Sequence, residues 1–192
     1  MYYIFDVKAV GSAALLLYIV IDFIRKGKVN LLNRFLFYSF ILYLLFVIQL
    51  TTGGIVVPPH RMMEPGMQLI PFYFIGDLYT MYQVHGLDWF FMNSLKLTSY
   101  NLLLLIPLGV YLSLLFKMKN LKHALLVIFF SSLAIETGQL VFSYLGIIQG
   151  RIFNVDDLIL NSTGGFIGYL LITALKRRKS KGEWRNVSAR KQ

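Results

Sequence analysis

The feature that most constrains this chain is a set of five apolar stretches, each long enough to cross a membrane. A helix that crosses the hydrocarbon core of a bilayer, about 30 Å thick, needs roughly 20 mostly apolar residues. Backbone polar groups find no water partners in lipid, so such a stretch is expected to be helical. The sequence therefore predicts an all-α, polytopic membrane protein with five transmembrane helices in one bundle. These spans are expected at residues 4–24, 35–55, 98–116, 123–147 and 156–175.

The composition agrees with a membrane protein and argues against several other classes. Only 15% of the 192 residues are charged, whereas soluble domains carry about 25%. There is no cysteine, so disulfides, thiolate zinc sites and cysteine nucleophiles are excluded. The net charge of +10 comes without the aromatic and basic interleaving typical of nucleic-acid binding. We expect no nucleic-acid partner, no cofactor and no metal, because no ligand spacing indicates a metal site.

The basic residues are distributed unevenly over the loops, and this predicts the orientation. Fifteen of the nineteen Lys and Arg residues lie in the first loop, in the third loop or after residue 175. Such an excess marks the cytoplasmic side of a membrane protein. The prediction is an N-terminus outside and a C-terminus inside. Residues 1–175 then form a single transmembrane domain, and residues 176–192 form a basic cytoplasmic tail that contacts anionic lipid.

The second loop, at about residues 56–97, is long and rich in proline and aromatic residues. It contains the runs Phe-Tyr-Phe at 72–74 and Trp-Phe-Phe at 89–91. Aromatic residues of this kind favour the interface between membrane and water. We therefore expect an outer loop that is re-entrant or interfacial and lies against the bundle.

Polar residues in three separate spans are expected at one depth. Each lies fourteen to sixteen residues from a lysine at the cytoplasmic end of its helix, which is about 21–24 Å at 1.5 Å per residue. All three therefore fall in the outer third of the membrane. They are Asn101, Glu136 and Asn161, with Gln139 and Asp157 slightly further out.

The last span carries its polar and small residues on one face. Asp157, Asn161, Gly164 and Gly168 share this face, whereas Asp156 points about 100° away. Gly164 and Gly168 form a small-xxx-small pair that lets another helix approach closely, so we assign them to helix packing.

Glu136 is the most informative of the polar residues, because an ionisable side chain within a span usually faces the interior and marks a function. A structural role is the alternative. Glu136 would then join an arginine and the two asparagines in a hydrogen-bonded cluster that holds the helices together.

Four sequence elements resemble the VanZ-like family. They are residues 150–158 (GRIFNVDDL), continued by Asn161, Gly164, Gly165, Gly168 and Tyr169; residues 101–109 (NLLLLIPLG); residues 135–139 (IETGQ); and Arg61 followed by residues 68–72 (QLIPF). The family usually has aspartate where this chain has Asn154, and asparagine where it has Gln68. The change at 154 removes a negative charge, so carboxylate chemistry is expected at Asp156 and Asp157.

The resemblance implies a multi-pass protein of the bacterial cytoplasmic membrane with a role at the cell envelope. The member that gives the family its name is associated with lowered susceptibility to teicoplanin. One hypothesis is that the chain lowers sensitivity to such glycopeptides by binding or altering a lipid-linked ligand at the outer leaflet. The partner would be a lipid, a lipid-linked envelope precursor or a lipoglycopeptide. Its phosphate would pair with Arg61 and Arg151, and Asn101, Gln139 and Asn161 would position it.

An enzyme is the alternative hypothesis. A hydrolase or transferase acting on an envelope lipid or lipid-linked precursor would use Glu136 as general acid or base. Asp157, with Asp156, would orient or activate a nucleophile. A second alternative is a small lipid transporter or flippase, which a buried polar cluster also suits. The sequence leaves these functions open.

Overall fold

The structure is a computed structural model that describes residues 3–60 and 66–189, the side chains of residues 180–189 excepted. In chain order its elements are β1 (Tyr3–Phe5), α1 (Val7–Lys26), α2 (Leu31–Thr52), β2 (Ile55–Val57), β3 (Met67–Gln68), α3 (Tyr73–His85), α4 (Trp89–Leu104), α5 (Ile106–Leu114), α6 (Leu121–Tyr144), β4 (Phe153–Asn154) and α7 (Val155–Ala189). The strands form two short pairs: β1 is antiparallel to β2, and β3 is parallel to β4.

Five helical segments of the described chain are long and apolar enough to cross a membrane, as the sequence predicts. They are α1, α2, α4 together with α5, α6, and residues Val155–Lys179 of α7. The third segment begins at Trp89, nine residues before the predicted start at 98, because Asp88 caps α4 by accepting a hydrogen bond from Phe91 N at 3.0 Å.

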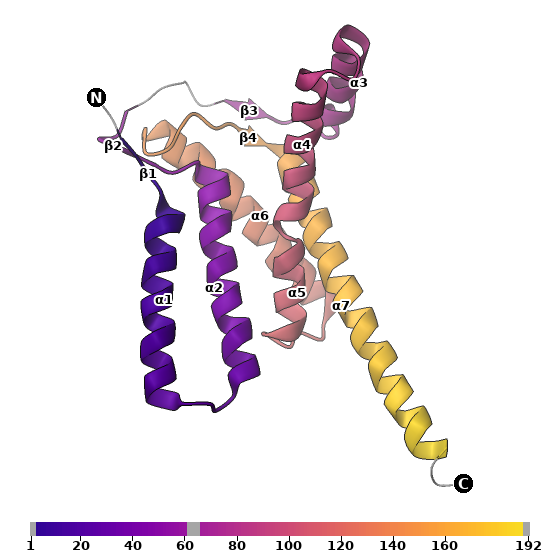
Figure 1. Cartoon of the computed structure of the whole chain (residues 1–192). Helices are drawn as coiled ribbons and strands as arrows, with labels where there is room; N and C mark the ends of the chain where they lie inside the picture. Colours follow the sequence, from indigo (N-terminus) through magenta and orange to yellow (C-terminus); the bar gives the residue numbers. More distant parts are fainter. Residues whose placement is uncertain (1–2, 61–65, 190–192) are drawn as a thin grey trace.

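The five segments run alternately up and down (Figure 1). We call one end of the bundle the pocket end, after the pocket that lies there, and the other the basic end, after its Lys and Arg residues. The pocket end carries α3 and both strand pairs. The basic end carries the α1–α2 loop, the α5–α6 loop and the exit of α7. At the basic end Arg34 Nε donates to Asp22 Oδ2 at 2.8 Å, and Tyr38 donates to the same carboxylate. These bonds tie α1 to α2.

In its described part, the second loop contains α3, which forms a helical hairpin with α4. None of the residues of α3 is buried, and the helix stands at the pocket end beside the first turns of α4 (Figure 1). Three of its four aromatic side chains, those of Tyr73, Tyr79 and Tyr82, are exposed. Whether this loop is re-entrant or interfacial in the membrane remains a prediction.

The third span is broken between α4 and α5. Pro107 has no backbone N–H, and its ring obstructs the carbonyl four residues earlier, so a continuous helix is disfavoured there. Leu105 lies at the break and is 2% exposed. The adjacent carbonyl oxygen of Leu104 accepts a hydrogen bond from the Tyr43 hydroxyl at 3.0 Å. This bond joins α2 to the α4–α5 junction.

Glycines allow α7 to lie directly against the backbone of α4 and α5. A Cβ atom at Gly164 would be 1.8 Å from the carbonyl oxygen of Leu102, and one at Gly168 would be 2.2 Å from that of Ile106. On the facing helix, a Cβ atom at Gly109 would be 2.0 Å from Gly165 O. Contacts this short leave no room for a methyl group, so the glycines set the distance between the helices.

We predict that Gly164→Ala destabilises the bundle, because its new methyl group meets backbone that cannot rotate away. Overpacking of this kind costs about 1–3 kcal/mol. The matched control is Gly138→Ala in α6, where the nearest atom to a new Cβ is 3.9 Å away. Thermal unfolding in detergent, followed by tryptophan fluorescence, should show a lower midpoint for the first variant only. Equal midpoints would contradict the close contact.

Candidate functional site

A pocket of about 430 Å³ lies at the pocket end, between α2, α3, α4, α6, α7 and the segment that precedes α7. Seven of the residues that the sequence analysis proposed for the site line this pocket. They are Asn101, Glu136, Gln139, Arg151, Asp156, Asp157 and Asn161. Arg61 lies outside the described residues. The chemical roles assigned to the seven remain predictions, but their side chains do come together.

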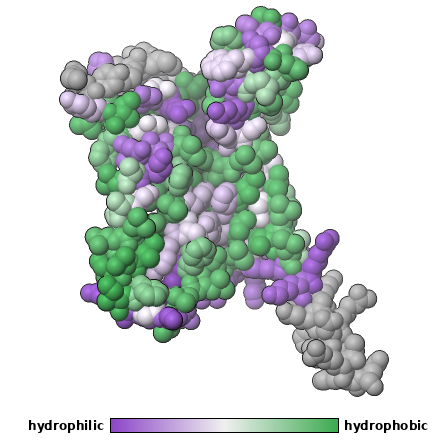
Figure 2. Space-filling view, in the orientation of Figure 1, coloured by the Kyte–Doolittle hydropathy of each residue, from purple (hydrophilic) through white to green (hydrophobic). Residues whose placement is uncertain are grey.

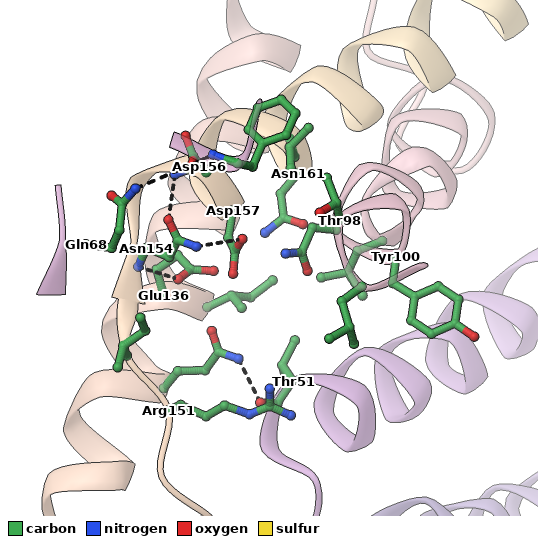
Figure 3. A pocket seen from close by; sticks show the side chains of 18 of the residues that line it. Thr51, Gln68, Thr98, Tyr100, Glu136, Arg151, Asn154, Asp156, Asp157 and Asn161 are labelled. Carbon is green, nitrogen blue, oxygen red and sulfur yellow. Dashed lines mark hydrogen bonds between the residues drawn. The ribbon is translucent and has the colours of Figure 1, made fainter. Parts of the chain in front are cut away.

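Asn154 holds two of the carboxylates that line the pocket, those of Glu136 and Asp157. Its backbone N–H donates to Glu136 Oε2 at 3.2 Å, and its side-chain Nδ2 donates to Asp157 Oδ1 at 3.1 Å (Figure 3). Its Oδ1 accepts from Asp156 N at 2.9 Å, which caps the start of α7. Asn154, which stands out in the sequence because the resembling family usually has aspartate there, thus links Glu136 to Asp157.

The amide donation depends on asparagine, because an ionised aspartate only accepts hydrogen bonds. Aspartate at 154 would add a carboxylate beside that of Asp157. The Asp157 carboxylate would also lose the hydrogen bond that the Asn154 amide donates. The departure from the usual residue of the VanZ-like family therefore changes the site by one charge and one hydrogen bond.

Two polar side chains are buried in the interior of the pocket. Glu136 is 2% exposed, and Asn161 is 1% exposed. Asn101 lines the same interior. The carbonyl oxygen of Asn161 is buried and has no hydrogen-bond partner among the described residues, although Asn161 and Asp157 project into the same space (Figure 3). A buried acceptor without a donor is costly, so it marks a place where a ligand could bind.

Asp156 anchors the second loop. Its carboxylate accepts hydrogen bonds from the backbone N–H groups of Phe72 and Phe74, the latter at 2.8 Å, and from Gln68 Nε2 at 3.5 Å. It is 2% exposed. Since Asp156 is turned away from Asp157 on α7, its oxygens hold the start of α3. A role in chemistry, which the sequence analysis assigned to it, remains a prediction.

Gln139 and Arg151 lie nearer the edge of the site. Gln139 Nε2 donates to the carbonyl oxygen of Thr51 at 2.7 Å, which ties α6 to the end of α2. The backbone N–H of Arg151 donates to Ser143 Oγ at 3.0 Å, while the side chain is exposed. Within the part of the chain that is described, its guanidinium has no ion-pair partner, so it is available at the mouth of the pocket.

The described residues contain no group of three or more His, Cys, Asp or Glu side chains that could hold a metal ion. The pocket combines several carboxylates, several amides and one guanidinium. This set can bind a polar group through hydrogen bonds and charge, or it can move a proton through Glu136.

Comparison with known families gives one match. The VanZ/LLP1 family profile matches residues 35–176, which includes all seven of the pocket residues named above. No curated protein and no solved structure matches the chain.

We predict that Asp156→Asn loosens the start of α3, because an amide cannot accept from both backbone donors. Losing one charge-assisted hydrogen bond costs about 1.5–3 kcal/mol, which corresponds to roughly tenfold or faster local exchange. Hydrogen–deuterium exchange of residues 70–76 measures this change. The control is Asp157→Asn, the same substitution one residue later, which should leave the exchange of that segment unchanged. Identical exchange in both variants would contradict the anchor.

Proposed function

This chain belongs to the VanZ/LLP1 family, and we propose that it binds the polar head of a lipid or lipid-linked ligand of the bacterial envelope in the pocket at its pocket end. In this proposal the pocket faces the outer leaflet of the cytoplasmic membrane. Binding or altering the ligand there lowers sensitivity to teicoplanin-like glycopeptides.

The observation that carries the proposal is the contrast between the polar interior of the pocket and its apolar opening. Leu50 of α2 and Leu97 and Tyr100 of α4 line the pocket from opposite sides and are 57%, 53% and 47% exposed. Hydrophilic side chains are visible in the hollow between the two helices, with hydrophobic surface on both sides (Figure 2). An amphiphile fits this arrangement, because its head meets polar groups while its tail stays in lipid.

The packing of α2 supports an opening toward lipid. Tyr43 ties α2 to the α4–α5 junction, and Gln139 ties its last turn to α6. Between these two bonds α2 is not packed along α4. A tail of one or two acyl chains would leave through this side. Arg151 at the mouth would pair with a phosphate, since guanidinium matches phosphate oxygens bidentately.

An enzyme on the same site is the second candidate. The observation that favours it is the pairing of Glu136 and Asp157 through Asn154, because two carboxylates in one enclosed site suit acid–base chemistry. Hydrolysis or group transfer would change the mass of the bound lipid. Mass spectrometry of lipids recovered from the purified protein distinguishes this function from binding alone.

We predict that Leu97→Trp obstructs the opening and weakens binding of a fluorescent long-chain phospholipid by about tenfold, or roughly 1.4 kcal/mol. Leu17→Trp is the matched control, since Leu17 is 63% exposed on α1 and distant in sequence from the pocket residues. Titration of purified protein in detergent measures the difference. In cells, the first variant should lose any protection against teicoplanin and the control should keep it. If both variants bind the lipid as the unchanged protein does, the opening between α2 and α4 is not used.

The proposed orientation is tested with single cysteines, because the chain has none of its own. Tyr79→Cys lies on exposed α3 and Lys28→Cys lies in the first loop at the basic end. A membrane-impermeant maleimide added to whole cells should label the first position and spare the second. Both should react once the membrane is permeabilised. The reverse labelling would place the pocket at the inner leaflet and overturn the proposed location.

A further inference from the structure

The interior of the pocket has an excess of negative charge and of hydrogen-bond acceptors. Glu136 and Asp157 both face it, and neither forms an ion pair among the described residues. Arg151 also lines the pocket, but its side chain is exposed. Carboxylates buried together at low dielectric repel each other unless a positive group or a proton lies between them. The interior is therefore complementary to a cation.

The hydrogen bonds within the site point to the same ligand chemistry. Asn154 uses its backbone N–H and its side-chain amide on Glu136 and Asp157. Each carboxylate still has acceptor positions free. The buried carbonyl oxygen of Asn161 accepts nothing. What the interior lacks is a group that only donates.

A primary ammonium is such a group, with three donors and no acceptor. Glu136, Asp157 and Asn161 offer three acceptors from two helices around one space (Figure 3). The last torsion of an asparagine is soft, so Asn161 can turn its oxygen toward a bound donor at small cost. A quaternary ammonium has no N–H and would leave these acceptors unpaired.

We propose that the ligand is an aminophospholipid, whose primary ammonium binds between Glu136, Asp157 and Asn161 while its phosphate faces Arg151. This inference rests on the proposed function and names its ligand class. The positive group enters the acidic interior, and the negative group stays at the basic mouth. The two charges of the head are thus matched in the order in which they occur along the molecule.

The test compares four phospholipids with the same acyl chains, bound to the purified full-length protein. Phosphatidylethanolamine has a primary ammonium. Phosphatidylcholine has a quaternary one. N-acetylated phosphatidylethanolamine and phosphatidylglycerol have none, and each carries one net negative charge. Phosphatidylethanolamine should bind at least about tenfold more tightly than each of the others.

Variants assign this preference to the interior of the pocket. Asp157→Asn and Asn161→Leu should reduce the preference for the primary amine to about twofold or less, while binding of phosphatidylglycerol stays within about threefold of that of the unchanged protein. The matched control is Asp6→Asn. It removes one carboxylate at the start of α1, where Asp6 caps the helix by accepting from Ala9 N at 3.0 Å, and asparagine caps equally well. This variant should keep the full preference.

The possible failures are distinguishable. Equal binding of all four lipids to the unchanged protein, still weakened by Leu97→Trp, overturns the amine inference and leaves the proposed function standing. If none of the pocket variants changes lipid binding, both the amine inference and the proposed function are overturned. If EDTA abolishes binding of all four lipids alike and Mg²⁺ restores it, a divalent cation occupies the acidic interior, and the ammonium assignment is wrong.

Discussion

The contact between α7 and the α4–α5 pair is the constraint on which the site depends. Asn101 belongs to α4, whereas Asp157 and Asn161 belong to α7, and their side chains meet only if the two backbones approach closely. Gly164 and Gly168 permit that approach, because the carbonyl oxygens of Leu102 and Ile106 occupy the space of their missing side chains. In lipid, where no hydrophobic effect drives helices together, packing of this kind and interhelical hydrogen bonds hold a bundle. The same contact therefore supplies both stability and geometry.

Much of the site could be predicted from the sequence because depth in a membrane is set by simple geometry. Counting residues from the basic end placed Asn101, Glu136 and Asn161 at one level, and the structure has all three around one pocket. The pattern of small residues on the last span likewise predicted the face that packs. These inferences use only the rise of a helix and the cost of polar groups in lipid.

The parts of the site that could not be predicted depend on hydrogen bonds between segments far apart in the sequence. Asp156 accepts from the backbone of Phe72 and Phe74, more than 80 positions earlier, and nothing in a helical pattern predicts such a bond. The early start of α4 depended on recognising Asp88 as a cap. Asn154 was noticed for its missing charge, whereas its two donated hydrogen bonds depend on where Glu136 lies. Local patterns predict helices and faces, but not which loop atoms they meet.

The charges of the site are arranged by depth. The carboxylates of Glu136 and Asp157 line the interior and are held there by the backbone and side-chain amides of Asn154, which carry no net charge. The guanidinium of Arg151 remains outside on the loop that precedes α7. A purely anionic head would be attracted to the mouth and repelled from the interior, whereas a head with both charges would be stabilised along its whole length. Under the proposed function an apolar tail would leave between α2 and α4, and the whole pocket would then be most complementary to a zwitterionic amphiphile, not to a soluble anion.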